Sequence, residues 1–289
     1  MLYNVTTMAT TWNTVATRDV RLLRKQMDIV CALPREYTFL NYLRCHDDIG
    51  WGLDYDTLET WGMQEVPHKK YLNDYFQGKT EGSVSRGELY NEDPVTGDAR
   101  FCATTASMCG IESAGFEQNE EKMDNAVRKD VMLHAYMFTQ SGIPMLYSGD
   151  EVGQVNDYTY KDDPEKAPDS RYIHRGKFNW DLVENIEDKN TVQGRLFHAL
   201  SELEEIRRNE SVFSTDAEVF TKDYSDTSIL WIVRKSEGEE LHAVFNFSDQ
   251  DKEVWMPEVR SYQNLVTGRT EQIRSTLLPS WSFLWLKKD

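Results

Sequence analysis

The hydrophobic pattern changes at Asn209, and this change most constrains the fold. Before it, apolar residues recur every three or four positions in several segments, which is typical of amphipathic helices. After it, β-prone runs alternate with Gly, Asp and Ser, and no helical period remains. The pattern predicts two domains, residues 1–209 and 210–289, of which the second is a small all-β sandwich. Its predicted strands are 217–221, 227–235, 240–247, 252–256, 261–266 and 282–287.

The first of these parts alternates helical and strand patterns. Helical segments with one apolar face are followed within a few residues by short apolar runs. A helix followed closely by a strand is typical of a parallel α/β fold. The predicted elements are helix 14–31 capped by Thr17, strand 37–43, helix 124–140, strand 143–147 and helix 191–209.

Residues 50–122 have little sustained periodicity and are rich in Gly, Asp, Glu, Asn and Tyr. Short helices are predicted near 58–61 and 71–76. A connection of this length is either functional or disordered, and its many aromatic residues argue against disorder. We expect it to carry functional loops on a rigid scaffold.

Composition limits the partners. The 289 residues carry a formal charge of −17, from 49 acidic and 32 basic residues, which repels nucleic acid and anionic membranes. No run of 18 apolar residues occurs, so no membrane span is expected. The cysteines, which form no CxxC pair, predict reduced, buried thiols and a cytoplasmic protein. They are Cys31, Cys45, Cys102 and Cys109.

His46, Asp47 and Asp48 follow the first predicted strand of the α/β part. In a parallel barrel, catalytic groups lie at the carboxyl ends of strands. A carboxylate there can stabilise a positively charged transition state and accept hydrogen bonds from sugar hydroxyls. The structural alternative is a helix cap, since Asp often follows a strand in that role. No further His or Glu lies at ligand spacing, so no metal site is expected.

A second predicted strand, 143–147, also ends in acids, at Asp150 and Glu151. Its position about a hundred residues after Asp47 fits another strand-to-loop junction. For these two acids we favour a structural or pocket-shaping role.

Four motifs occur together in this chain. They are Asn41-Tyr-Leu-Arg-Cys-His-Asp-Asp-Ile-Gly-Trp51, Gly142-Ile-Pro-Met-Leu-Tyr-Ser-Gly-Asp-Glu151, Trp12-Asn-Thr-Val-Ala-Thr-Arg-Asp19 and Asp169-Ser-Arg171, which Ile-His-Arg175 follows. The combination resembles glycoside hydrolase family 13, the α-amylase class, and is most similar to amylosucrases and related sucrose-acting enzymes. The resemblance implies the C-terminal portion of a (β/α)8 barrel, about strands six to eight, with the inserted region 50–122 and a following β-domain. Met1–Asn4 resemble the end of the sixth strand.

The resemblance also implies roles for individual residues. Asp47 resembles the carboxylate that stabilises the oxocarbenium-like transition state, and His46 the histidine that binds the glucosyl unit. Asp48 resembles the acid that lines the sucrose pocket, and Arg171 the arginine that closes the pocket floor by pairing with an acid. In the irregular region, Arg86 and Arg100 are candidates for contacts with the acceptor sugar, although exposed arginine is the default.

Retaining enzymes of this class also need a nucleophile and a general acid/base. Before Asp47 the chain offers only Asp19, Asp28 and Glu36, none in a context that resembles those motifs. We therefore expect a fragment that is inactive alone. No cofactor is expected.

Two functions stay open. The parent enzyme cleaves sucrose through a covalent glucosyl intermediate and passes glucose to an α-glucan, a maltooligosaccharide or water. Alternatively, the chain is a carbohydrate-binding remnant without catalysis. A weaker third reading is an unrelated metal-dependent α/β hydrolase.

Overall fold

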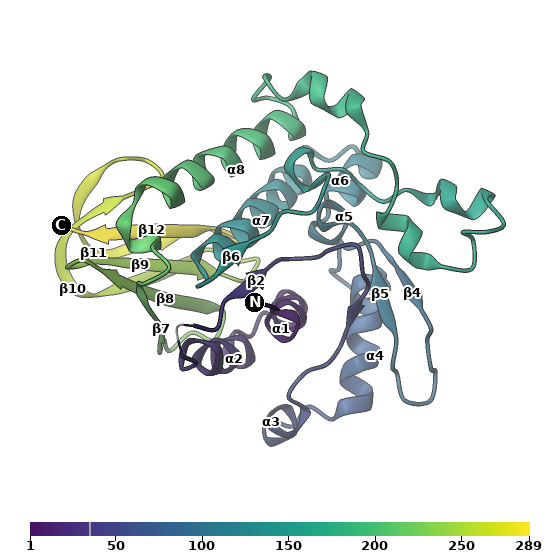
Figure 1. The fold of residues 1–289 in the computed structure, drawn as a ribbon, viewed down its shortest axis with the longest axis horizontal. Helices are drawn as coiled ribbons and strands as arrows, with labels where there is room; N and C mark the ends of the chain where they lie inside the picture. The colour runs from purple at the N-terminus through teal and green to yellow at the C-terminus, as the bar shows by residue number, and fades with distance from the viewer. Residues whose placement is uncertain (35) are drawn as a thin grey trace.

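Three short parallel strands lie side by side in the first part of the chain. In the computed structural model, which describes residues 1–34 and 36–289, they form a sheet of order β1–β2–β6 (Figure 1). Helices separate them in sequence, as parallel connections require. The predicted helix–strand alternation is thus confirmed. The elements are β1 (Leu2–Tyr3), α1 (Val5–Thr17), α2 (Arg21–Cys31), β2 (Phe39–Asn41), α7 (Glu120–Thr139) and β6 (Ile143–Pro144).

The single helix predicted over 14–31 is wrong, because the chain breaks there into α1 and α2. Arg18 has a left-handed backbone (φ 57°), which ends α1. The carboxylate of Asp19 then accepts a 3.0 Å hydrogen bond from the backbone N–H of Arg21, the first residue of α2. Thr17 is therefore the last residue of α1 and does not cap the following helix.

Residues 50–122 hold more regular structure than predicted. The two short helices expected there are confirmed as α3 and the end of α4, but a three-stranded antiparallel sheet of order β3–β5–β4 was not predicted. Its strands are too short for an alternating pattern to show in the sequence. The elements are β3 (Ile49–Gly50), α3 (Tyr55–Thr60), α4 (Glu65–Phe76), β4 (Glu88–Tyr90), β5 (Arg100–Cys102), α5 (Thr105–Cys109) and α6 (Ile111–Glu117).

The segment between β6 and the last helix consists largely of short 3-10 turns. Several begin with an Asp or Asn side chain that accepts a backbone N–H, as Asp169 does from Arg171 at 3.0 Å. The helix predicted over 191–209 is confirmed as α8, whose buried residues recur with a helical period. The elements are η1 (Asp150–Val152), η2 (Tyr158–Asp162), η3 (Ser170–His174), η4 (Trp180–Asn185), α8 (Val192–Asn209) and η5 (Ser211–Phe213).

The C-terminal strands form one antiparallel sheet of order β11–β10–β12–β9–β8–β7, at the end of the molecule opposite the irregular segments (Figure 1). All six strands belong to one hydrogen-bonded sheet, which folds over on itself: the Tyr224 hydroxyl contacts the backbone of β10, and residues of β8 to β12 share a buried cluster. The predicted all-β arrangement of two packed layers agrees with these contacts. Two predicted runs are one strand, β10, whose register with β11 shifts between Trp255 and Arg260. The strands are β7 (Glu218–Lys222), β8 (Ile229–Ser236), β9 (Glu239–Asn246), β10 (Lys252–Asn264), β11 (Thr270–Leu278) and β12 (Phe283–Lys288).

One hydrophobic core joins the helices to this sheet. It includes Trp12 of α1, Leu133 of α7 and Phe245 of β9, all fully buried. Polar contacts cross the same boundary. Arg234 of β8 is 1% exposed and donates a 2.8 Å hydrogen bond to the carbonyl of Thr139, the last residue of α7. The indole of Trp285 donates to the Thr139 hydroxyl at 2.9 Å.

Three of the four cysteines are buried, as predicted, and Cys31 is half-buried. All four are free. None of the helices in the described part of the chain combines the length and apolar character of a membrane span.

Candidate active site

The segment that follows β2 is anchored in the core before it reaches its polar residues. The Trp12 indole donates a 2.7 Å hydrogen bond to the Leu43 carbonyl. Arg44 comes next, is 2% exposed and lies 3.2 Å from the carboxylate of the equally buried Asp150. These contacts fix the backbone at Leu43 and Arg44, and so they position the polar residues that follow, beginning with His46.

Asp47 lines an open cavity of about 660 Å³. Its side chain is 57% exposed, so it is accessible to a ligand in that cavity. The walls combine the ends of the parallel strands with the inserted region, which the sequence predicted to build the pocket. Other lining residues are Tyr3, Tyr42, Gly50, Gly52 and Arg100.

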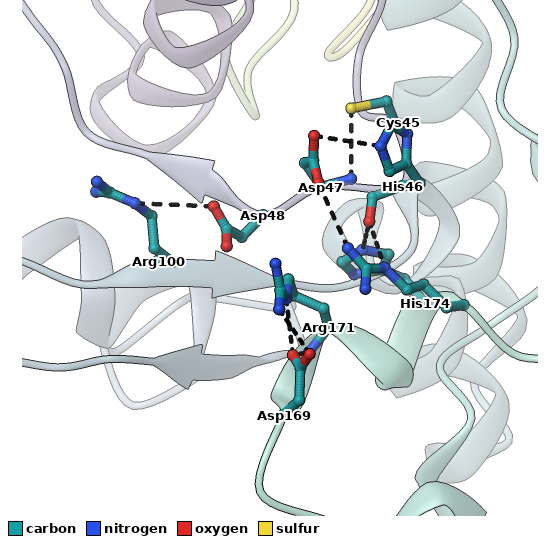
Figure 2. A network of polar contacts seen from close by, with 9 residues as sticks. Cys45, His46, Asp47, Asp48, Arg100, Asp169, Arg171 and His174 are labelled. Carbon is teal, nitrogen blue, oxygen red and sulfur yellow. Dashed lines mark hydrogen bonds and ion pairs between the residues drawn. The ribbon is translucent and has the colours of Figure 1, made fainter. Parts of the chain in front are cut away.

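His46 lies beside Asp47 and lines the same cavity. Its Nε2 is 3.3 Å from the Asp47 carboxylate, and its side chain is 60% exposed (Figure 2). The two side chains therefore present an imidazole and a carboxylate to one space. The structure brings together these two predicted site residues.

Arg175 is a site residue that the sequence did not single out. Its Nε donates a 2.6 Å hydrogen bond to the backbone oxygen of His46, and its Nη2 lies 3.4 Å from the Asp47 carboxylate. The neighbouring His174 also places Nε2 3.2 Å from the same His46 oxygen. The signal was the Ile-His-Arg run after Arg171, but nothing in it indicated a partner 128 residues away.

Asp48 lines the cavity and is less exposed than Asp47, at 19%. Partial burial raises its pKa, while the nearby guanidinium of Arg100 acts in the opposite direction. The Nε of Arg100 is 3.7 Å from the Asp48 carboxylate. The structure thus places Asp48 and Arg100 in the cavity wall, facing each other from β5 and the segment after β2 (Figure 2).

Arg171 pairs with Asp169 in its own motif. Two nearly parallel contacts join them, Nε to Oδ1 at 2.8 Å and Nη2 to Oδ2 at 2.7 Å. The hydrogen bonds to Asp169 raise the pKa of Arg171 and lower that of Asp169. Such a fork fixes the arginine's direction. Figure 2 shows this pair below the Asp48 side chain.

Arg86 does not join this group. Its Nη1 donates to the carbonyl of the preceding Ser85 at 2.8 Å, and it is not among the residues that line the Asp47 cavity. Of the two arginines considered for the acceptor side, only Arg100 lies in the cavity wall.

The acids after β6 have structural contacts, in agreement with the prediction. Asp150 pairs with Arg44 in the interior, and Glu151 accepts a 2.8 Å hydrogen bond from the backbone N–H of Gly149. Neither lines the cavity of Asp47.

The three acids that precede Asp47 also lie elsewhere. Asp19 pairs with Arg21, and Asp28 accepts a hydrogen bond from the Thr221 hydroxyl. Glu36 is exposed to solvent. Within the described residues, none of these carboxylates lines the cavity.

One group near the site could offer three ligands to a metal ion. Atoms of Cys45, His46 and Asp47 lie within 4.8 Å of one another. However, the Cys45 sulfur accepts a 3.5 Å hydrogen bond from the backbone N–H of Asp47, and burial raises the pKa of its thiol. A protonated thiol is a poor ligand. The absence of a metal stays a prediction.

Comparison with known proteins identifies sugar-acting enzymes. No protein-family model matches the chain. It is 25% identical over 172 residues to glucosylglycerate phosphorylase of Escherichia coli (strain K12). The aligned residues make up 59% of this chain and 30% of that protein. Sucrose 6F-phosphate phosphorylase from Thermoanaerobacter thermosaccharolyticum is similar in structure, with a TM-score of 0.59, 16% identity, and 95% and 46% of the two chains covered.

A second solved structure is the α-amylase of Geobacillus thermoleovorans in complex with acarbose, with a TM-score of 0.53, 12% identity, and 98% and 46% covered. The chain thus spans less than half the length of each protein it matches here. The structural likeness shows a shared fold. In sequence and in structure, the relatives of this chain are enzymes of the α-amylase family.

Proposed function

We propose that the parent protein is a retaining, α-glucoside-acting enzyme that cleaves sucrose, as amylosucrases do, and that this chain supplies part of its glucosyl site. The barrel strands would be the sixth to eighth, with domains at 1–209 and 210–289 and a cytoplasmic location. The observation that carries the proposal is the position of Asp47 and His46 together in the cavity wall after β2.

The chemistry assigns Asp47 an electrostatic role. Cleavage breaks the bond between the glucosyl C1 and the fructosyl oxygen, a nucleophilic carboxylate takes the glucosyl group as an ester, and an acid gives its proton to the departing fructose. Positive charge grows at C1 and the ring oxygen in between. The Asp47 carboxylate accepts hydrogen bonds from the sugar hydroxyls and stabilises this charge.

The remaining residues bind and orient. His46 binds a hydroxyl of the same glucosyl unit, and Asp48 lines the pocket beside Arg100. Arg171, held by Asp169, is not among the residues that line the Asp47 cavity, and its proposed role at the pocket floor rests on its position near Asp48. Arg175 positions the Asp47 carboxylate through its contact at 3.4 Å.

In this proposal the nucleophile and the general acid/base lie in the part of the longer protein that this chain does not span. Because no further carboxylate apart from Asp48 lines the Asp47 cavity among the described residues, the chain alone binds sugar but does not turn it over. A non-catalytic remnant would behave in the same way, so only the longer protein separates the two functions.

The test measures binding and turnover on the 289-residue chain. Isothermal titration with sucrose and with maltotetraose is compared with fructose release. We expect saturable binding that Asp47→Asn weakens by about tenfold or more, since hydrogen bonds to charged groups contribute about 1.5–3 kcal/mol. Fructose release by the unmodified chain would contradict the missing-acid argument, and equal binding by Asp47→Asn would contradict the site.

A second candidate reaction is phosphorolysis, with inorganic phosphate as the acceptor of the glucosyl group. It is favoured by the names of two relatives, glucosylglycerate phosphorylase and sucrose 6F-phosphate phosphorylase. The cations Arg100 and Arg175 lie beside the site acids and would meet such an anion. Formation of glucose 1-phosphate from sucrose and phosphate by the longer protein would identify this reaction, and glucan growth would identify transfer.

A further inference from the structure

Lys129 is a buried lysine that lines a different cavity from the one at the sugar site. Lys129 is on α7, is 5% exposed, and makes no hydrogen bond or ion pair with any residue in the described part of the chain. Its Nζ lies 4.4 Å from the centre of the Trp281 ring. Lysine is almost never buried without a partner of opposite charge, so this ammonium calls for one.

A separate cavity of about 150 Å³ adjoins Lys129. It is formed by α7, by the residue that ends α1, by residues of α4, α5 and the segment between them, and by two loops of the C-terminal sheet. Its lining includes Arg18, Cys109, Lys122, Asp249 and Trp281, none of which lines the Asp47 cavity. A single water needs roughly 15 Å³ by the same measure, so the space is large enough for a small polyatomic ligand.

Arg18 contributes a second incompletely paired cation. Its Nη2 lies 3.0 Å from the Asp249 carboxylate, but its buried Nε has no hydrogen-bond partner among the described residues. Two cationic side chains from different elements, Arg18 and Lys129, therefore line one cavity.

The charge of the lining is positive in a strongly acidic chain. Arg18, Lys122 and Lys129 face one carboxylate, Asp249, and Lys122 also pairs with Glu117 outside the lining. The whole chain carries −17. Burial lowers the pKa of Lys129 to about 8, which leaves the ammonium charged at neutral pH. Burial raises the pKa of the Cys109 thiol, so that group adds no negative charge.

We propose that this cavity binds a small oxyanion, with Lys129 and Arg18 as its ligands. Sulfate, phosphate and a short carboxylate share the chemistry that two such cations recognise. The anion would sit between α7 and the loops around Asp249 and Trp281. Because the anion would contact α7 and these loops together only in the folded state, its binding stabilises the packing of the loops against the helix.

The experiment titrates the 289-residue chain with sodium sulfate at constant ionic strength, by calorimetry and by thermal unfolding. Sulfate is the probe because it is not a proposed acceptor of the glucosyl group, whereas phosphate is a candidate acceptor at the sugar site. We expect saturable binding and a rise in melting temperature, with Lys129→Met weakening binding at least tenfold. Phosphate and acetate, tested in the same way, separate oxyanions from carboxylates.

Controls separate this site from the sugar site and from general salt effects. Lys70→Met, at an exposed position, should bind sulfate like the unmodified chain, and the binding that depends on Lys129 should persist in Arg175→Met, a variant of the sugar site. Arg18→Gln provides a second test should Lys129→Met fail to fold. The proposal is overturned if sulfate does not bind, if Lys129→Met or Arg18→Gln binds it unchanged, or if only Arg175→Met loses it. Loss of sucrose binding would not affect it.

Discussion

The Arg175 guanidinium lies 3.4 Å from the Asp47 carboxylate, across 128 positions of sequence. The same side chain holds the backbone oxygen of His46 at 2.6 Å. A single residue of the segment after η3 therefore contacts both sugar-facing residues that follow β2.

Removing this arginine should weaken sugar binding. We expect Arg175→Met to raise the dissociation constant for sucrose about tenfold, because the Asp47 carboxylate and the His46 carbonyl lose a common donor. Arg175→Lys, which keeps the charge, should recover part of the loss. Titration calorimetry checks both, with exposed Arg208→Met as the control. Unchanged affinity in Arg175→Met would remove this residue from the site.

The buried pair of Arg44 and Asp150 should be more sensitive to the loss of one partner than of both. Both side chains are at most 3% exposed and lie 3.2 Å apart. Arg44→Met leaves a buried carboxylate without its cation, which costs about 3–5 kcal/mol of unfolding free energy. Arg44→Met combined with Asp150→Asn should cost less than Arg44→Met alone. Urea unfolding measures the three variants, and a double variant as unstable as the sum would contradict the coupling.

His174 should make the stability of the fold sensitive to acid. Burial lowers the pKa of His174 to about 3, while the unfolded side chain has the ordinary histidine pKa of about 6.5. The unfolded state therefore binds the additional proton between these values, and stability falls as pH falls from 6.5 toward 3. For this residue alone the loss is about 1.4 kcal/mol per pH unit.

His174→Gln should make that slope shallower in urea unfolding between pH 6.5 and 4.5. His68 and His242 also have lowered pKa values because they are buried, so they contribute to the remaining slope. An unchanged slope in His174→Gln would show that folding does not lower the pKa of His174.

Gly142 should not tolerate a side chain. Its φ is 109°, and a Cβ there would lie 2.4 Å from the Phe39 carbonyl in the neighbouring strand β2. We expect Gly142→Ala to lower the unfolding free energy by about 1–3 kcal/mol. Gly52→Ala is the matched control, because no heavy atom lies within 4 Å of its added Cβ and its effect should stay within about 0.5 kcal/mol. Equal stability of the two variants would contradict this.

The sequence was sufficient for the elements that carry a long apolar period. Helix α8 buries one face over its 18 residues, and the 20-residue helix α7 is buried on all sides from Met132 to Thr139; both lie where the pattern predicts a helix. The segment of His46 and Asp47 was also predicted, because a short apolar strand precedes it. Asp48 and Arg100 were each singled out, although their mutual contact was not.

The missed features depend on tertiary contacts. Strands β3, β4 and β5 have two or three residues each, so pairing across the sheet, and not local preference, defines them. The break at Arg18 depends on a left-handed backbone at a residue that does not favour one. The role of Arg175 depends on its contacts with His46 and Asp47, which lie more than a hundred residues earlier in the sequence.

The hydrogen bond from Arg234 to the last carbonyl of α7 has a consequence for how the molecule comes apart. Separating the C-terminal sheet from the helices would leave the Arg234 guanidinium, the Thr139 carbonyl and the Trp285 indole without their hydrogen-bond partners. It would also expose the hydrophobic core that the two parts share. Neither the helical part nor the C-terminal sheet can therefore unfold at a small cost in free energy while the other stays folded. Heating should therefore produce one calorimetric endotherm for the whole chain. Truncation after residue 209 should leave a helical part that is less stable and exposes its side of the shared core.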